Sequence, residues 1–297
     1  MNSGGGPKLV IDERFLLYID ILGFAEMTKR QPRKVARLYA ILDSLNVHRH
    51  ETFKTIVFSD TVLVYNPKVV TTDKDRNYLV WYLIEFAEDL HHRLTGQDIY
   101  FRAVVTTGNF SHYALKNIEC FVGEALVSAY LHEKQIPSIG LFIDNECNKY
   151  NEYFRVARFD NECHFVYLNR SLETLEQSTG GEYPFTDRGS GIEDGTPYTP
   201  WQVRFLKDVY ENMRTHRSPS VRTKFLTAWD FYSKRYPGMT RELVNKAFSL
   251  TALGPAGAWR SEAKAMEKDI KSNKRMGSGT QLSLQVSGTA RRRHSTR

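Results

Sequence analysis

Residues 15–24 read FLLYIDILGF, an apolar, strand-like run that places Asp20 between Ile19 and Ile21. A second apolar run, TIVFSDTVLVY at residues 55–65, contains Asp60. Burying a lone carboxylate costs on the order of several kcal/mol unless the group is paired or bound to a metal. Two such aspartates in one chain therefore suggest a common cause, and a shared metal site is the hypothesis to test.

The segments around these aspartates predict the element order βαββαβ. The predicted elements are a strand over 15–21, an amphipathic helix behind Pro32 over 32–47, a tight hairpin of 52–58 and 61–65, a helix over 77–94 and a strand over 99–108 ending at Gly108. This order is typical of the α+β, ferredoxin-like arrangement, an antiparallel sheet with two helices on one face. Strand one and the hairpin would lie side by side, so Asp20 and Asp60 would converge at one edge.

The rest of the chain predicts further elements and a division into segments. A helix over 123–135, a strand over 139–144 and a hairpin of 153–159 and 163–168 extend the core. Two helices follow residue 200, the second stopped by Pro237. We expect a flexible N-terminus (1–11), a core domain (12–170), an irregular connection (171–199), C-terminal helices (200–253) and a basic, disordered tail (254–297).

The composition is that of a globular protein, with 41% apolar and 12% aromatic residues in 297. The net charge of +7 resides in residues 254–297, which hold ten Lys or Arg and three acidic residues, so a nucleic-acid-binding core is not indicated. Three cysteines without a CxxC pair indicate neither a disulfide framework nor a zinc site. No segment reaches the about 20 apolar residues of a membrane span. We therefore expect a cytoplasmic location.

Two converging carboxylates favour a hard cation such as Mg²⁺ or Mn²⁺, and a pair of such ions can serve phosphoryl transfer. Gly23, after Asp20, allows backbone N–H groups to approach a triphosphate closely. The alternatives are ordinary ones. Asp20 could be an edge residue with its carboxylate in water, Asp60 a turn aspartate, and Gly23 part of a plain strand-to-helix turn.

Four segments together resemble the signature blocks of class III nucleotidyl cyclases. They are FLLYIDILGF, TIVFSDTVLVY, FRAVVTTGNF and FVGEALVSAYLHEKQ, in the family's order and at about its spacing, over roughly residues 12–145. The resemblance implies that Asp20, Asp60 and the carbonyl of Ile21 hold two divalent ions. It also implies that the amides of Gly23 and Phe24 hold the phosphates.

The departures from the family pattern concern the base pocket and the transition state. Ile56 and Cys120 stand where purine cyclases place their base-selecting polar residues, and Val127 and Leu131 stand where the family has asparagine and arginine. A site without those polar partners discriminates poorly for adenine. Phe58 and Phe121 lie next to these positions and would narrow the pocket. Arg102 is a candidate contact to substrate phosphate or base, with pairing to a surface carboxylate as the alternative.

These features resemble the pyrimidine cyclase branch of bacterial antiphage (Pycsar) systems. The resemblance implies conversion of UTP, or else CTP, to the 3′,5′-cyclic monophosphate and pyrophosphate, with the product acting on a separate receptor effector. It also implies a homodimer with two interface sites, in which one subunit's Asp20 and Asp60 face the partner's residues 121–131 and Arg102. The alternatives are a purine cyclase, a polymerase-palm-like nucleotidyltransferase, and a non-catalytic nucleotide-binding or dimerisation module.

Overall fold

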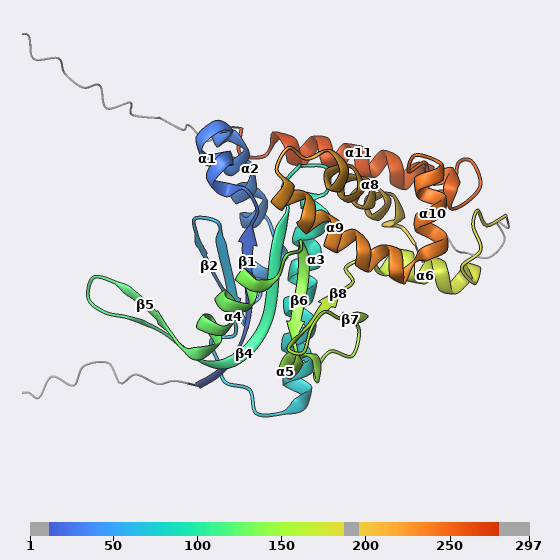
Figure 1. Ribbon diagram of the computed structural model, residues 1–297. Helices are drawn as coiled ribbons and strands as arrows, with labels where there is room; N and C mark the ends of the chain where they lie inside the picture. Colours follow the sequence, from blue (N-terminus) through green and yellow to red (C-terminus); the bar gives the residue numbers. More distant parts are fainter. Residues whose placement is uncertain (1–11, 187–195, 279–297) are drawn as a thin grey trace, which may run out of the picture.

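The computed structural model describes residues 12–186 and 196–278. Within those ranges, eight strands form a sheet in the order β2-β3-β1-β4-β6-β8-β7, and β5 pairs with the far half of β4 (Figure 1). The strands are β1 (Asp12–Ile21), β2 (Lys54–Phe58), β3 (Thr61–Tyr65), β4 (Phe101–Ala114), β5 (Glu119–Val122), β6 (Gly140–Asp144), β7 (Val156–Arg158) and β8 (Cys163–Val166).

The first half of the chain has the predicted βαββαβ order. Helices α1 (Phe24–Arg30) and α2 (Pro32–Asp43), with the short 3-10 helix η1 (Asn46–Arg49), connect β1 to the β2–β3 hairpin. Helix α3 (Asp73–Leu94) connects that hairpin to β4. Strand β1 lies between β3 and β4 and is antiparallel to both. The α+β, ferredoxin-like fold class is therefore confirmed.

Side chains of β1 alternate between the two faces of the sheet, as strand geometry requires. Phe15, Leu17 and Ile19 join the core formed with α2 and α3. Leu16 and Tyr18 point to the other face, where they pack with alanines of α4 (Glu124–Gln135). Asp20 continues this second series, so its side chain lies on the face covered by α4.

Strand β4 is longer than the sequence predicts. Gly108 does not end the strand, because it pairs with Arg14 of β1 and the following residues pair first with β1 and then with β5. A glycine inside a strand weakens it but does not end it here, because the pairing of β4 with β1 continues through Gly108. The far end of β4 and β5 form an arm that projects from the body of the molecule (Figure 1).

A helical layer covers the α4 face of the sheet beyond β4. Its helices are α6 (Arg170–Thr179), α8 (Thr199–Thr215), α9 (Pro219–Arg235) and α10 (Pro237–Asn245), with the 3-10 helix η2 (Leu250–Ala252) after α10. Helix α11 (Arg260–Arg275) contacts α8, α2 and α3, and the four-residue α5 (Asn145–Asn148) at the end of β6 contributes Cys147 to the core on the other face. Val104, Phe142 and Phe165 point out of the sheet into a core with Phe225 and Tyr232 of α9. Helix α9 therefore packs on the sheet, and α6, α8 and α10 contribute to the same core.

One prediction for this region is wrong, and another is incomplete. The segment 171–199, predicted as irregular, contains most of α6, because Leu172 and Leu175 are fully buried at helical spacing. Pro237 does stop α9, but it also starts α10, because proline is tolerated in the first turn of a helix. The remainder of the connection, residues 187–195, lies outside the described residues.

The tail predicted as disordered is helical over Arg260–Arg275. Helix α11 docks through buried Ile270, whose carbonyl accepts a hydrogen bond from Gln97 Nε2 at 3.0 Å, and through Asn273, which donates to the Arg93 carbonyl at 3.1 Å. Few buried apolar side chains hold α11 in place, and hydrogen bonds to residues far away in the sequence add to its attachment. The predicted flexible N-terminus and the last part of the tail, residues 279–297, lie outside the described residues.

Among the helices of residues 12–186 and 196–278, none combines the length and the apolar character needed to cross a lipid bilayer.

Candidate active site

Asp20 is the second-to-last residue of β1, and β1 has a neighbouring strand on each side. It pairs with Thr61 of β3 and with Arg102 of β4. Its side chain is 19% exposed, and one carboxylate oxygen lies 3.5 Å from the Arg102 guanidinium. Burial raises the pKa of Asp20, the charge of Arg102 opposes that shift, and the charge of Asp60 adds to it.

Asp60 lies in the turn between β2 and β3, beside the end of β1. Its carbonyl accepts a hydrogen bond from the Ile21 amide at 2.9 Å. The turn is held from α2, where the Tyr39 hydroxyl donates to the Ser59 carbonyl at 3.0 Å. The two aspartates therefore meet at one edge of the sheet, as the topology predicts.

The turn from β1 into α1 is built around Gly23. Gly23 has φ 71°, a left-handed conformation that favours glycine, and a Cβ at this position would meet nothing within 4 Å. The Leu22 amide donates to the Tyr100 carbonyl at 2.9 Å, and buried Phe24 anchors the turn in the core. The Gly23 backbone thus faces open space next to Asp20, while the Phe24 side chain points inward.

Arg102 lies beside Asp20 of the same chain. This corrects the expectation that the Arg102 facing Asp20 comes from the partner subunit. The guanidinium donates to the Ile136 carbonyl and pairs with Glu133 of α4. Glu133 is buried, as is Arg102, so the pair is an internal one rather than a contact with a surface carboxylate. Arg102 is therefore placed to hold Asp20 in position.

The predicted base-pocket residues are not all gathered at the aspartates within one chain. Ile56 of β2 packs against the cluster of buried side chains between α4 and the sheet, and the Phe58 residue on the hairpin is 79% exposed. Cys120 pairs with Tyr113, eleven residues along β4 from Arg102. At about 3.3 Å per residue this is roughly 35 Å along the strand. Cys120 therefore lies far from Asp20 of its own chain.

The structure adds three charged residues that the sequence blocks do not single out. Glu133 follows Ala125 and Ala129 at four-residue spacing on the buried face of α4, so its burial was readable from the helical period. Lys134 and Lys224 come close enough for their charges to lower the pKa of Asp20. No local pattern marks Lys224, because α9 reaches this site only through the tertiary fold.

The donor set fits a divalent cation. Asp20 and Asp60 offer hard carboxylate oxygens, and Ile21, the third predicted ligand, follows Asp20 and is hydrogen-bonded through its amide to the Asp60 carbonyl. Two neighbouring carboxylates of which one is partly buried repel each other, and a bound cation removes that repulsion. Among the described residues, no group of three or more acidic, histidine or cysteine side chains forms an additional ligand cluster.

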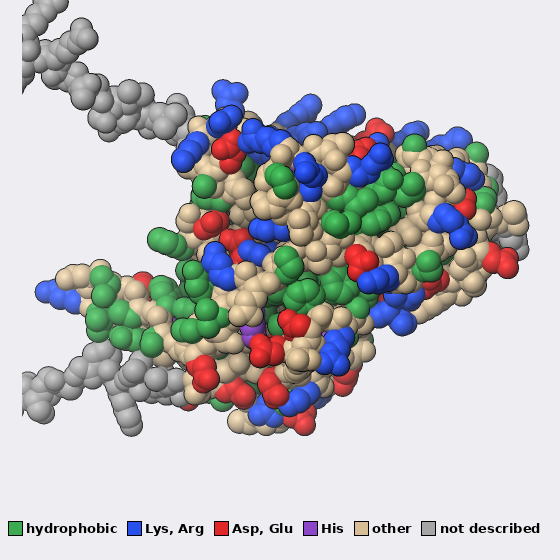
Figure 2. All heavy atoms as spheres, viewed as in Figure 1, with side chains coloured by type: hydrophobic (Ala, Val, Ile, Leu, Met, Phe, Trp, Pro, Cys, Tyr) green, Lys and Arg blue, Asp and Glu red, His purple; other side chains and the backbone are tan. Residues whose placement is uncertain are grey.

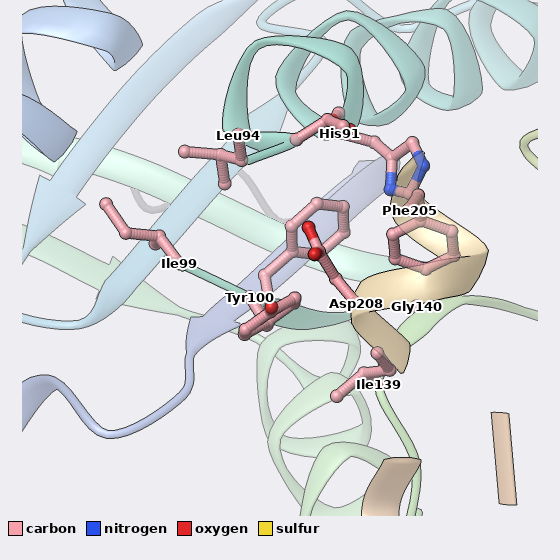
Figure 3. Close-up of a pocket in the computed structure, with 10 residues that line it drawn as sticks. His91, Leu94, Ile99, Tyr100, Ile139, Gly140, Phe205 and Asp208 are labelled. Atoms are coloured by element: carbon pink, nitrogen blue, oxygen red, sulfur yellow. The ribbon is translucent and has the colours of Figure 1, made fainter. Parts of the chain in front are cut away.

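Three cavities of the described residues lie away from the aspartates. The cavity in Figure 3, between the end of α3 and α8, has a volume of about 20 Å³ and is lined by His91, Tyr100 and Phe205 among others. A cavity of about 480 Å³ lies between α3, α6 and α8, and one of about 240 Å³ lies at the far end of β1. Neither Asp20 nor Asp60 lines any of the three.

An apolar surface adjoins the candidate site. We call it the α4 surface, and its exposed residues on α4 and the hairpin are Val57, Phe58, Val127, Tyr130 and Leu131. Hydrophobic side chains also gather over the β5 arm, including Ile118 and Phe121 (Figure 2). Val127 is 58% exposed, so the C-terminal helices do not cover this helix within the described chain.

Comparisons with known proteins give structural neighbours only. No protein-family model matches the chain, and no curated protein does. The guanylate cyclase domain of RhGC from Catenaria anguillulae in complex with GTP is 16% identical, covering 52% of this chain and 96% of its own (TM-score 0.42). The monomeric guanylyl cyclase domain of the RhoGC fusion protein from Blastocladiella emersonii is 16% identical, covering 52% and 95% (TM-score 0.43). The adenylyl cyclase CyaB from P. aeruginosa is 14% identical, covering 54% and 96% (TM-score 0.40).

Proposed function

We propose that the chain is a nucleotide cyclase whose Asp20 and Asp60 hold two Mg²⁺ or Mn²⁺ ions. The observation that carries this proposal is the meeting of both aspartates at one sheet edge, where the Ile21 amide bonds to the Asp60 carbonyl. The four sequence blocks support the same assignment, because they place the aspartates in the family's metal-binding positions.

In the reaction, the ribose 3′-oxygen forms a bond to the α-phosphorus, the bond to the α–β bridging oxygen breaks, and pyrophosphate leaves. The hydroxyl proton passes to solvent. Asp20 and Asp60 would hold the divalent ions, which when bound would lower the pKa of the 3′-hydroxyl and neutralise charge on the leaving pyrophosphate. The Gly23 and Phe24 amides orient the phosphates, and Arg102 keeps the Asp20 carboxylate at the sheet edge.

The site is proposed to be completed by a second copy of the chain. The aspartates lie outside the three cavities described above, and Cys120 is remote from them within one chain. The α4 surface is apolar and exposed, which suits burial against a partner. Val127 and Leu131, the family's transition-state positions, lie on this surface and would face the partner's aspartates.

The proposed substrate is a pyrimidine nucleoside triphosphate, UTP before CTP. Ile56 and Cys120 lack the hydrogen-bonding groups that select a purine, and exposed Phe58 can narrow a pocket shared between two chains. The choice of UTP follows the resembling branch, as does the proposal that the product activates a separate receptor effector in antiphage defence. A purine cyclase is the first alternative.

A second candidate function is a nucleotide-binding module without catalysis. The observation that favours it is that exposed Val127 and Leu131 offer no charge or hydrogen bond to a transition state. Such a module would be stabilised by nucleotide and Mn²⁺ without converting it.

The test is incubation of the full chain with each of the four nucleoside triphosphates and Mn²⁺, with products identified by mass. We expect cyclic UMP, or cyclic CMP, and pyrophosphate. Preferential cyclisation of ATP or GTP at equal concentration would overturn the pyrimidine assignment. Thermal stabilisation without any product would support the non-catalytic module instead.

A further inference from the structure

The N-terminal half of α9 lies against the β1–α1 turn that follows Asp20. The Phe225 ring packs edge-to-face on Tyr100, with centroids 4.8 Å apart, and the Tyr100 carbonyl accepts the Leu22 amide. Just before α9, Arg217 pairs with Glu26 of α1 at 2.8 Å. These contacts fix α9 beside the turn whose amides are proposed to bind phosphate.

Lys224 lies at the edge of the buried face of α9. It is three residues after Val221 and four before the fully buried Ala228, so its stem shares their side of the helix. The side chain is half-buried, yet within the described residues the structure records no hydrogen bond or ion pair for its ammonium group. Burial and the like charge of Arg102 lower the pKa of Lys224, and the charge of Asp20 opposes that shift.

Three cations converge beside Asp20, namely Arg102, Lys134 and Lys224. Arg102 and Lys134 share the carboxylate of Glu133, from which Lys134 is 3.7 Å distant. In the described chain no carboxylate lies within ion-pair distance of Lys224, and the carboxylate whose charge acts on it is that of Asp20. Like charges brought together out of bulk water repel, and a bound anion turns that repulsion into attraction. Figure 2 shows basic and acidic side chains gathered above α4, toward α9.

We propose that Lys224, supplied by the C-terminal helices, binds the phosphate chain of the nucleotide at the Asp20–Asp60 site, with Lys134 beside it. The proposal rests on the proposed function for the identity of the ligand. A lysine acts on phosphate as a compact, mobile point charge, so it can follow a leaving pyrophosphate. Because α9 lies outside the βαββαβ core, Lys224 is not part of any of the four sequence blocks.

The test measures binding of inorganic tripolyphosphate to the full chain by calorimetry in metal-free buffer. We expect Lys224→Met to weaken binding by about tenfold, because one charge-assisted contact is lost. Lys224→Arg should retain most of the affinity. The matched control is Lys234→Met on the same helix, whose ammonium is exposed and paired with Asp230, and it should bind like the parent.

A second measurement needs no variant. Amine acetylation of the parent protein, mapped by peptide mass spectrometry, should slow at Lys224 and Lys134 when tripolyphosphate is present, and remain unchanged at Lys234. Equal tripolyphosphate affinity of Lys224→Met and the parent, no binding by the parent, or no protection of Lys224 would each overturn the proposal. Weakened binding in Lys224→Met without nucleotide turnover by the parent would leave the anion site standing and remove the cyclase assignment.

Discussion

His91, near the end of α3, is a buried histidine that links the stability of the protein to pH. The centroid of its ring lies 4.3 Å from that of the Phe205 ring of α8 in an edge-to-face contact, and Figure 3 shows the two rings next to each other in the lining of the small cavity. Burial lowers the pKa of His91 to about 3, and the charge of His92 contributes to the shift. The folded protein therefore keeps His91 neutral through the mildly acidic range.

We predict that His91→Phe makes the protein less sensitive to acid. Between pH about 6.5 and about 3 the unfolded chain binds a proton at His91 that the folded protein does not, so falling pH destabilises the fold by up to about 1.4 kcal/mol per pH unit. Urea unfolding at pH 8, 7, 6 and 5 measures this. At pH 8 the histidine is neutral in both states, so that point controls for the change in packing. Equal slopes for parent and variant would contradict the prediction.

At the level of single residues, the sequence locates the aspartates but not all of their neighbours. Asp20 and Asp60 stand out because a carboxylate in an apolar strand is rare and costly. Arg102 was identified, but its placement in the partner subunit was wrong, because the pairing of β1 with β4 sets Arg102 beside Asp20 of the same chain. The sequence does not indicate Lys224 as a site residue, because no local pattern shows that α9 packs beside β1.

At the level of elements, the periodicity of apolar residues predicts the strands and helices of the core. It does not predict elements whose extent depends on contacts with residues far away in the sequence. The β1 alternation and the β2–β3 hairpin follow from residues of each segment alone. Gly108 was taken as a strand end, yet its partners lie on β1, far away in sequence. The polar composition of α11 does not predict a packed helix, and contacts with residues distant in sequence, among them Gln97 and Arg93, hold it in place.

We predict that α11 depends on Ile270. Ile270→Ala should lower the free energy of unfolding by about 2–4 kcal/mol, because a buried side chain is removed from a helix with few other anchors. Urea denaturation measures the loss, and limited proteolysis should show earlier cleavage within residues 260–275. Lys271→Ala, an exposed neighbour, is the matched control. An unchanged midpoint in Ile270→Ala would mean that α11 does not dock as described.

At the scale of the whole molecule, Asp20, Asp60, Gly23 and Arg102 lie together in one chain, while Cys120 lies far from them along β4. The proposed dimer would bring Cys120 and the α4 surface of one chain to the aspartates of the other. The position of Arg102 beside Asp20 of the same chain differs from the one expected from the sequence. That difference changes which variants can complement each other.

We predict that Asp60→Asn and Cys120→Trp chains, each inactive alone, recover part of the activity when mixed. A mixed dimer would contain one site with an intact Asp60 from one chain and an intact Cys120 from the other. Mixing Asp60→Asn with Arg102→Met is the control and should give no recovery, because both residues belong to the same half-site. Heterodimers without recovery in the first mixture would place each site within one chain.

The assignment of Asp20 and Asp60 as the metal-binding aspartates of a nucleotide cyclase is tested by the rate of cyclic nucleotide formation in Mn²⁺ for three variants. We predict that Asp20→Asn and Asp60→Asn each lose about 100-fold or more of the parent rate, because an electrostatic contribution to the transition state disappears. Their thermal midpoints should stay near that of the parent, because loss of a repelling carboxylate does not destabilise the core. Asp12→Asn, at the other end of β1, should react like the parent. Substantial activity in folded Asp60→Asn would contradict the account.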